Sequence, residues 1–403
     1  MFSRSLRSKQ TLPLAQSVLA QLNRRYLAQV TGVGPLPAED DKPFEVPIPD
    51  DSFETYNLDP PPYTLETTKR ELRQLYRDMM TIRRMELAAD RLYKEQKVRG
   101  FCHLSTGQEA VAVGIEHAIT RDDKLITAYR SHGFTFMRGG SLKSIIGELL
   151  GRQEGISYGK GGSMHMFAKG FYGGNGIVGA SVPVGAGIAF AQQYNDTGNV
   201  TINLYGDGAA NQGQVHEAFN MAKLWNLPVM FGCENNQYGM GTSAERASAM
   251  TDYYKRGHYI PGLRVNGMDV LAVLIAVRYG RDYIREGNGP LVYEYVTYRY
   301  AGHSMSDPGV IYRTREELQE KRKQDPLTVL KTKLVAWGVN TEDEIKALDK
   351  EIRNDVNQAV LEAEQMPDPP PTADTLFQDI YSRGSEPAYM RGRTVYETYY
   401  YPK

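Results

Sequence analysis

Apolar and polar residues follow a clear order between positions 200 and 236. The run Val200–Tyr205 is short and contains Val, Ile and Tyr, which is typical of a buried parallel strand. After Gln214 the apolar side chains recur every three or four residues, which predicts a helix with one buried face; they are Val215, Ala218, Phe219, Ala222 and Trp225. A second apolar run, Leu227–Cys233, predicts another strand. We expect both strands to end at the same edge of a parallel sheet, where open α/β sheets bind ligands.

The same kind of pattern extends to either side of this unit. Apolar residues at helical spacing predict a long helix over Thr64–Arg99, and a helix is expected to start at Ser181. A strand that runs into a loop is expected at Leu125–His132, and a further strand at Pro290–Tyr298. Two capping boxes mark later helix starts: Thr314 with Glu317, and Thr341 with Glu344. These elements predict an α/β domain with a central parallel sheet, helices on both faces and a C-terminal helical extension.

The composition limits the class of function. The chain has 403 residues and is 41% hydrophobic, so it can bury a sizeable core as one large domain or two. A net charge of -1 gives no electrostatic reason to expect nucleic acid or an anionic membrane as a partner. Cys102 and Cys233 form neither a disulfide framework nor a zinc spacing. The most apolar stretch, Val270–Val277, is far shorter than the ~18 residues of a membrane span, so no membrane association is expected.

The N-terminal segment has the composition of a targeting sequence. Its first 38 residues contain no Asp or Glu, and its basic residues are Arg4, Arg7, Lys9, Arg24 and Arg25. A basic amphipathic helix among serines and leucines is typical of a mitochondrial transit peptide. We therefore predict a transit peptide over residues 1–30 and a location in the mitochondrial matrix, with a plain basic tail as the alternative. Residues 31–62, which turn acidic and proline-rich, are predicted to form an extended lead-in.

Oxygen-bearing side chains follow both strands of the central unit. Asp207 comes directly after the first strand, and Asn236 follows the second. Mg2+ prefers oxygen ligands and is usually held by one or two protein oxygens together with phosphates. Gly208 and Ala209 are small enough for backbone N–H groups to approach a phosphate at a helix N-terminus. The sequence therefore predicts a site for Mg2+ and a diphosphate.

The residues of this edge also resemble a known family. GDGAANQGQ at 206–214 and ENNQYGMGTS at 234–243 are similar to the thiamine diphosphate motif of the pyruvate dehydrogenase family, in the alpha subunit of its decarboxylating component. The likeness extends from about Tyr63 into the 360s. It implies a thiamine diphosphate-binding fold over 63–365 and a C-terminal tail over 366–403. It also implies oxidative decarboxylation of pyruvate and reductive acetylation of lipoyl groups, with thiamine diphosphate and Mg2+ as cofactors.

The resemblance assigns roles to individual residues. The implied metal ligands are Asp207, Asn236 and the backbone carbonyl of Tyr238. The implied thiamine diphosphate contacts are His103, Tyr129, Arg130, Ala168, Gly176, Val178, Asp207, Gly208, Ala209, Asn236, Arg299 and His303. The motifs GFCHL and AYRSHG imply that His103, His132 and His303 face the reacting groups. The chemistry suits these assignments, because an arginine fork matches phosphate oxygens and a histidine can move protons near neutral pH.

The same resemblance implies partners and regulation. Ser304 is the implied principal phosphorylation site and Ser243 a second one, which calls for a kinase and a phosphatase as partners. The carboxylate that bonds the aminopyrimidine ring in this family lies on a separate domain, and no second sheet-forming segment of matching size is expected after the 360s here. We therefore expect the chain to be inactive without a beta subunit in an α2β2 assembly. The lipoyl domain of dihydrolipoyl acetyltransferase is the implied acceptor of the product.

Other functions stay open at this point. Within the same family the substrate could be a branched-chain 2-oxo acid or acetoin, although Phe101, Cys102 and His103 favour pyruvate. The chain could also be a non-catalytic assembly subunit, but Asp207 and Asn236 are both present. A nicotinamide dehydrogenase is disfavoured, because GDGAAN has no third glycine of a GxGxxG fingerprint and the next strand ends in asparagines.

Overall fold

The computed structural model describes residues 38–382, 384–391 and 398–400. The predicted transit peptide, residues 1–30, lies outside the described residues, and so does the beginning of the predicted lead-in. In the part of the chain that is described, no helix is both long and apolar enough to cross a lipid bilayer.

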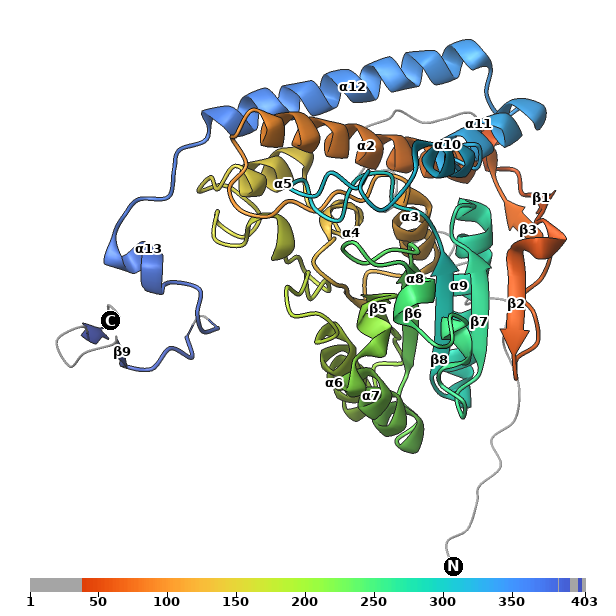
Figure 1. Cartoon of the computed structure of the whole chain (residues 1–403), viewed down its shortest axis with the longest axis horizontal. Coiled ribbons are helices and arrows are strands. Elements are labelled where there is room, and N and C mark those ends of the chain that lie inside the picture. Colours follow the sequence, from red (N-terminus) through yellow and green to blue (C-terminus); the bar gives the residue numbers. More distant parts are fainter. Residues whose placement is uncertain (1–37, 383, 392–397, 401–403) are drawn as a thin grey trace, which may run out of the picture.

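A sheet of six strands, counted over the described residues, forms the centre of the fold (Figure 1). In spatial order the strands are β2 (Phe53–Tyr56), β7 (Gly262–Asn266), β8 (Leu291–Val296), β6 (Val229–Asn235), β5 (Thr201–Gly206) and β4 (Lys124–Ile126). The strands from β7 to β4 are mutually parallel, as predicted, but β2 pairs antiparallel with β7. The sheet is therefore mixed, because a strand from the segment expected only to lead into the domain completes its edge.

The predicted strand–helix–strand unit is confirmed. β5 ends at Gly206, α7 spans Gly213–Leu224, and β6 ends at Asn235. β5 and β6 are direct neighbours, and Gly206 lies opposite Glu234 in their parallel register. The residues that follow the two strands therefore emerge side by side at one edge of the sheet.

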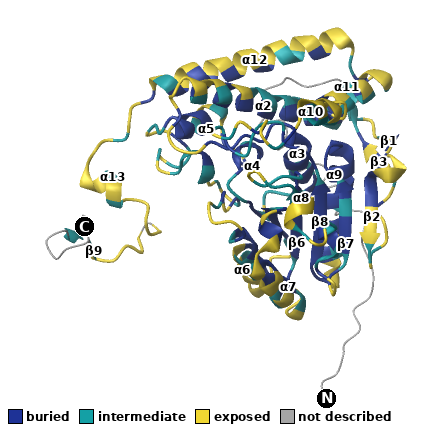
Figure 2. Cartoon of the chain, viewed as in Figure 1, coloured by how far each residue is buried: buried dark blue, intermediate teal, exposed yellow. Residues whose placement is uncertain are grey.

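Helices cover both faces of this sheet. Successive side chains of a strand point to opposite faces, so neighbouring residues of β5 enter different core clusters. Leu204 packs in the cluster that contains α3 (Glu109–Ala118) and α9 (Val270–Tyr283), whereas Tyr205 packs with α6 (Ser181–Tyr194) and α7. Figure 2 shows the strands buried between these two layers of helices.

The long helix predicted within Thr64–Arg99 is α2 (Lys69–Lys94), which begins after the N-cap Thr68. The four residues before the cap instead form β3 (Thr64–Thr67), which pairs antiparallel with β1 (Phe44–Pro47). Their exposure alternates with a period of two, which is a strand pattern. The helix prediction was wrong at this end because the four residues are too few to separate from the longer helical pattern that follows.

The C-terminal helical extension is α12 (Glu342–Gln365), which packs along α2 and against α5 (Leu142–Leu149) (Figure 1). Its predicted capping box is complete. The Thr341 hydroxyl accepts from the Glu344 N–H at 3.2 Å, and the Glu344 carboxylate accepts from the Thr341 N–H at 2.9 Å. These bonds satisfy backbone donors that a helix N-terminus otherwise leaves unpaired.

The other predicted capping box forms only in part. The Thr314 hydroxyl accepts from the Glu317 N–H at 3.0 Å and caps α10 (Arg315–Arg322). The Glu317 carboxylate, however, accepts from the hydroxyl groups of Tyr238 and Tyr298. It therefore bonds tyrosines of the loops that follow β6 and β8, and not the backbone at the start of its own helix.

The remaining elements are α4 (His132–Met137), α8 (Ala244–Ala247), α11 (Pro326–Ala336), α13 (Ala373–Phe377), β9 (Tyr389–Arg391) and β10 (Thr398–Tyr400). α13 and β9 belong to the predicted C-terminal tail, and they extend away from the rest of the chain in Figure 1. β9 and β10 pair with each other as a short antiparallel ladder.

Gly185 allows α6 to lie directly on β5. A Cβ added at Gly185 would come within 2.2 Å of Asn203 Nδ2, and that side chain is fully buried and donates to the Val182 carbonyl at 2.7 Å. We predict that Gly185→Ala lowers the free energy of unfolding by about 1–3 kcal/mol through overpacking, measured by denaturant unfolding.

The matched control removes the obstructing side chain. Asn203→Ala is expected to be destabilising on its own, because the Val182 carbonyl loses its partner. In the double variant the new methyl group meets no amide. The decrease in its free energy of unfolding should therefore be smaller than the sum of the decreases in the two single variants. Additive losses would show that the predicted collision does not occur.

Candidate functional site

Asp207 and Asn236 meet at the edge where β5 and β6 end. Asp207 is only 4% exposed and Asn236 only 9% exposed. Burial raises the pKa of the Asp207 carboxyl, while its own N–H, Arg299 and the backbone N–H of Asn236 act to lower that pKa. The carboxylate is thus close to the Asn236 backbone, as the sequence predicted, and it lies where a cation would relieve the cost of burying its charge.

Arg299 donates hydrogen bonds to two oxygen atoms at this edge of the sheet. Its Nη1 donates to Asn236 Oδ1 at 3.1 Å and to the Tyr238 carbonyl at 3.0 Å. Arg299 is 1% exposed, and burial together with Arg130 and Arg313 lowers its pKa to about 10. Its Nη2 has no hydrogen-bond partner within the described part of the chain. A buried cation therefore already contacts two of the three oxygens predicted to bind a metal.

This set of donors fits Mg2+. Asp207 offers a carboxylate oxygen, Asn236 an amide oxygen and Tyr238 a backbone carbonyl, and all three are the hard ligands that Mg2+ prefers. Over the described residues, no group of three or more His, Cys, Asp and Glu side chains is placed to hold a metal ion. Of the three proposed ligands, only Asp207 is a side chain of these types, which suits an ion that takes its other ligands from phosphates and water.

The backbone after Asp207 leaves room for a phosphate. An added Cβ at Gly208 would meet nothing within 4 Å, although Ala209 beside it is buried. These residues precede α7, so their N–H groups lie in the turn that leads into its N-terminus. The turn can accept an anion without moving a side chain.

Three aromatic rings gather beside this edge from distant parts of the chain. The ring centroids of His103 and Tyr129 are 4.6 Å apart, those of His103 and His303 are 5.4 Å apart, and those of Tyr129 and His303 are 5.5 Å apart. Burial and the charge of Arg130 lower the pKa of His103 to about 3 and that of His303 to about 4. Both imidazoles are therefore neutral near pH 7, and in the described structure the Nδ1 atom of each is buried without a partner.

Arg130 joins the two segments that carry these histidines. Its Nη1 donates to the Leu104 carbonyl at 2.6 Å, and its Nη2 donates to the His303 carbonyl at 2.9 Å. Arg130 is 7% exposed and follows β4, the strand beside β5. Its positive charge also holds both histidines in the neutral form, since a second nearby cation is unfavourable.

His132 lies behind the ring cluster. It is the first residue of α4 and is 1% exposed. Its Nδ1 is 2.9 Å from Glu86 Oε2, and its Nε2 is 2.8 Å from Ser163 Oγ. Both ring nitrogens are occupied by protein groups, so this geometry favours a role in positioning over direct contact with a substrate.

The glycine-rich segment forms an exposed wall near the start of α7. Gly176 and Val178 are exposed, and the Val178 carbonyl accepts from Gln214 Nε2 at 3.3 Å. Ala168 lies deeper, where it is bridged to Phe171 and packs against the core. The segment is thus placed beside the helix that follows Asp207, with its outer surface free in this single chain.

The predicted phosphorylation sites differ in exposure. Ser304 is 5% exposed, and its hydroxyl pairs with that of Ser306 at 2.8 Å. The loop around it is closed by Asp307, which accepts from the His303 N–H at 2.7 Å and the Gly309 N–H at 2.9 Å. Ser243 is half-buried and caps α8, accepting from the Arg246 N–H at 3.3 Å.

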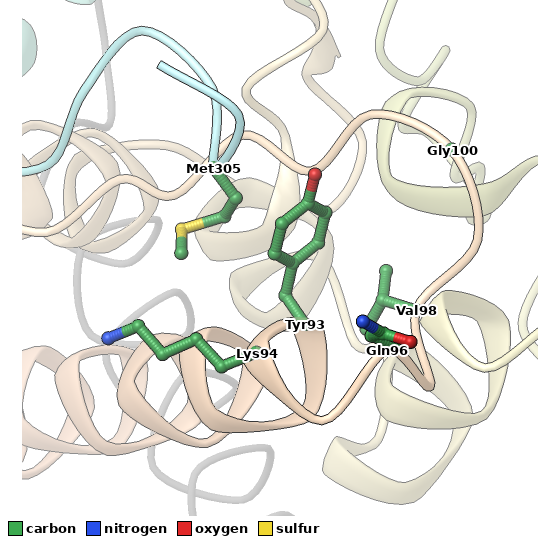
Figure 3. A pocket seen from close by; sticks show the side chains of 6 residues that line it. All are labelled: Tyr93, Lys94, Gln96, Val98, Gly100 and Met305. Atoms are coloured by element: carbon green, nitrogen blue, oxygen red, sulfur yellow. The ribbon is translucent and has the colours of Figure 1, made fainter. Parts of the chain in front are cut away.

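A separate pocket of about 500 Å3 opens at the end of α2, and its lining residues are Tyr93, Lys94, Gln96, Val98, Gly100 and Met305 (Figure 3). None of the predicted site residues lines this pocket. It is linked to the site through the backbone, where the Met305 N–H donates to the Cys102 carbonyl at 2.9 Å.

Sequence reasoning missed several residues that hold the site together. Glu86 contacts His132, and Arg313 donates to the carbonyls of Arg299 and Ala301 at 2.5 and 2.7 Å. For Glu86 a signal existed, because it is an acidic residue within the buried stripe of α2. A carboxylate on an apolar helix face is usually paired, and its partner is often functional.

Comparison with known proteins shows the family of the chain. The family model described as "Dehydrogenase E1 component" matches residues 77–372. The chain is 63% identical to a Chaetomium thermophilum protein named "Pyruvate dehydrogenase E1 component subunit alpha, mitochondrial", with both chains covered in full. A Saccharomyces cerevisiae protein of the same name is 59% identical over 89% of this chain and 86% of its own. The human somatic form is 57% identical over 82% of this chain and 85% of its own.

The lowered pKa of His103 predicts a pH effect on stability. In the unfolded chain a histidine titrates near ~6.5, so between that value and about 3 the unfolded state binds more protons than the folded state. The contribution is full above pH ~6.5 and is lost as the pH falls below it. We predict that the Tm falls between pH 7.5 and pH 5, and that it falls less in His103→Gln, measured by circular dichroism.

His117 supplies a control of opposite sign. Burial lowers its pKa, but the bond to Asp78 and the charge of that residue outweigh burial, so the pKa of His117 is raised. Its contribution is therefore present at low pH and is lost as the pH rises through the folded pKa. The Tm of His117→Gln should fall more steeply towards pH 5 than that of the parent. Equal slopes in the parent and both variants would contradict this electrostatic description.

Proposed function

Because the chain belongs to the dehydrogenase E1 component family, we propose that it acts as the alpha subunit of a mitochondrial pyruvate dehydrogenase decarboxylating component. In this role it takes part in the oxidative decarboxylation of pyruvate and the transfer of the acetyl group to a lipoyl group. Within the mitochondrion we propose the matrix as its location.

The observation that carries the proposal is the meeting of Asp207 and Asn236 at the ends of neighbouring strands. Thiamine diphosphate, the cofactor of the family, supplies an electron sink for decarboxylation when it is bound. Asp207, Asn236 and the Tyr238 carbonyl would hold Mg2+, and the backbone of Gly208 and Ala209 would contact the diphosphate. The donor types support Mg2+, since each is an oxygen.

The arginines would complete the binding of the diphosphate. Arg299 donates to two of the proposed metal ligands. A carbonyl oxygen has two lone pairs, so the same oxygens could bind Mg2+ while they accept from the guanidinium. Its Nη2, which has no partner in the described structure, and its burial support a contact with a phosphate oxygen, where a planar fork of donors fits well. Arg130 would help to neutralise the same anion.

The neutral histidines would act on the substrate. An uncharged imidazole carries one N–H donor, which can bond the carboxylate or the developing oxyanion of a 2-oxo acid. His103 and His303 each have a buried Nδ1 without a partner in the described structure, which supports this role. Tyr129 packs against both rings and would limit their motion.

The exposed glycine-rich wall supports a second chain as a partner. Val178 is 43% exposed and its neighbour Ile177 is 72% exposed, although the resemblance places the aminopyrimidine ring against this segment. A ring on such a surface would be open to water, so another subunit is needed to cover it and to supply the missing carboxylate. We propose a beta subunit in an α2β2 assembly, with the lipoyl domain of the acetyltransferase as acceptor.

We also propose that phosphorylation of Ser304 inactivates the protein, through a kinase and reversed by a phosphatase, with Ser243 as a second site. A phosphoryl group adds about two negative charges beside a site that is built for anions. Ser304 is buried against Ser306, so modification requires the loop to open and prevents it from closing again.

The metal site is tested with Asp207→Asn in the assembled α2β2 protein. We predict that the affinity for thiamine diphosphate in the presence of Mg2+ falls at least tenfold, about 1.4 kcal/mol, because a charged ligand is lost. Calorimetry with and without a chelator measures this. The chelator should weaken the binding of thiamine diphosphate to the parent protein, and it should barely change binding to the variant.

Asp269→Asn is the matched control for this experiment. Asp269 is also buried, at 5% exposure, but its carboxylate caps α9 and pairs with Lys333. It should retain Mg2+-dependent binding. If Asp207→Asn retains it as well, Asp207 is not a metal ligand.

The regulatory proposal is tested with a pyruvate dehydrogenase kinase and ATP. We predict that the treated parent loses at least nine-tenths of its activity through charge repulsion, and that Ser304→Ala remains active. Ser306→Ala is the control, since Ser306 is exposed beside the same loop, and it should still be inactivated. Inactivation of Ser304→Ala at the rate of the parent would exclude this site.

A further inference from the structure

We infer that Glu86, His132 and Ser163 form a buried hydrogen-bonded line that holds the segment His103–Ser105 in place, and that they are positioning residues for the reaction. This inference rests on the proposed function, because the reaction of pyruvate is its readout. It gives the buried His132 a role that does not require contact with the substrate.

The line begins and ends on the same short segment. The His103 N–H donates to Ser163 Oγ at 3.1 Å, and Ser163 Oγ is 2.8 Å from His132 Nε2. His132 Nδ1 is 2.9 Å from Glu86 Oε2. The other oxygen of Glu86 accepts from the Ser105 N–H at 3.0 Å and from the Ser105 hydroxyl at 2.8 Å. The backbone is thus fixed on both sides of Leu104.

The direction of the bonds follows from the chemistry of the groups. Burial raises the pKa of Glu86, but His132 and Ser105 outweigh burial, so the pKa of this carboxyl lies below its usual value. An ionised carboxylate only accepts, so His132 Nδ1 donates to it. Ser163 Oγ accepts from the His103 N–H and also hydrogen-bonds to His132 Nε2. The hydrogen bonds therefore run without a break from Glu86 to the backbone of His103.

All three residues are shielded from water. Glu86 is 0%, His132 1% and Ser163 2% exposed. Hydrogen bonds at such sites are costly to leave unmade, because no water molecule replaces a lost partner. A buried network that is fully satisfied therefore holds its members in one arrangement.

The turn that leads to Ser163 is held by a second buried carboxylate. Glu148, on α5, is 0% exposed and accepts four backbone N–H bonds of 2.7 to 2.9 Å, from Ser157, Gly159, Gly161 and Gly162. An added Cβ at Gly155 would come within 2.4 Å of its Oε2. The turn that precedes Ser163 is therefore fixed to α5, while Glu86 is fixed to α2.

This anchoring matters because the His103 ring has little else to hold it. Its Nδ1 has no hydrogen-bond partner in the described structure, and its neighbours Tyr129 and His303 contact it only through ring faces and edges. The place of the ring therefore depends on the backbone at residues 103 to 105. A shift of ~1 Å in a group that meets the substrate can cost about 100-fold in rate.

The test compares Ser163→Ala and Glu86→Gln in the α2β2 holoenzyme, loaded with thiamine diphosphate and Mg2+. We expect kcat for pyruvate to fall between ~10-fold and ~100-fold in both variants, because the His103 segment is released. Calorimetric affinity for thiamine diphosphate with Mg2+ should stay within twofold of the parent, since neither side chain bonds the residues that are proposed to hold the metal ion and the diphosphate.

Asp78→Asn is the matched control. Asp78 lies on α2 two turns before Glu86 and also pairs with a histidine, the partly buried His117, at 2.8 Å, but none of its hydrogen bonds reaches the site. It should lower the Tm while kcat stays that of the parent. Glu86→Gln has a further readout: its amide can donate to His132 Nδ1, which moves the ring hydrogen to Nε2, and 15N histidine shifts report that change of tautomer.

Each outcome decides the inference. If Glu86→Gln fails to assemble, Ser163→Ala provides the same test with a change of one oxygen atom. A kcat of Ser163→Ala equal to that of the parent would overturn the inference, and so would an equal loss of kcat in Asp78→Asn. These results differ from failure of the proposed function, in which the parent holoenzyme itself would not turn over pyruvate.

Discussion

The central constraint is the cost of a carboxylate that is buried at the edge of a parallel sheet. Asp207 is 4% exposed, and burial raises its pKa, so the fold must supply positive charge or a metal ion close to it. The pairing of β5 with β6 brings Asn236 to the same place, and Arg130 and Arg299 surround the pair. The remaining parts of the site are arranged around this concentration of oxygen ligands and cations.

Arg299 stabilises this edge of the sheet. Its guanidinium donates to Asn236 Oδ1 and to the Tyr238 carbonyl, which keeps these buried oxygens paired inside the protein. The carbonyl of the same residue accepts from Arg313, which helps to fix its backbone. One buried cation is therefore held beside the oxygens that are proposed to bind the metal ion.

The periodicity of apolar residues predicted the elements of the central unit. The strand from Val200, the helix after Gln214 and the strand from Leu227 are all confirmed, because each depends on residues that are close together in the sequence. The antiparallel edge strand β2 and the tie between Glu86 and His132 were not predicted. Glu86 and His132 are 46 positions apart, and nothing next to either residue indicates the other. His132 was assigned towards the reacting carbon by resemblance, whereas its ring nitrogens contact Glu86 and Ser163.

The most direct test is a crystal structure of the α2β2 protein grown with thiamine diphosphate and Mn2+, which replaces Mg2+ and scatters anomalously. The account predicts one anomalous peak bounded by an Asp207 carboxylate oxygen, Asn236 Oδ1 and the Tyr238 carbonyl, each about 2.0–2.2 Å from the ion. A peak elsewhere, or no peak at these oxygens beside bound diphosphate, would contradict it.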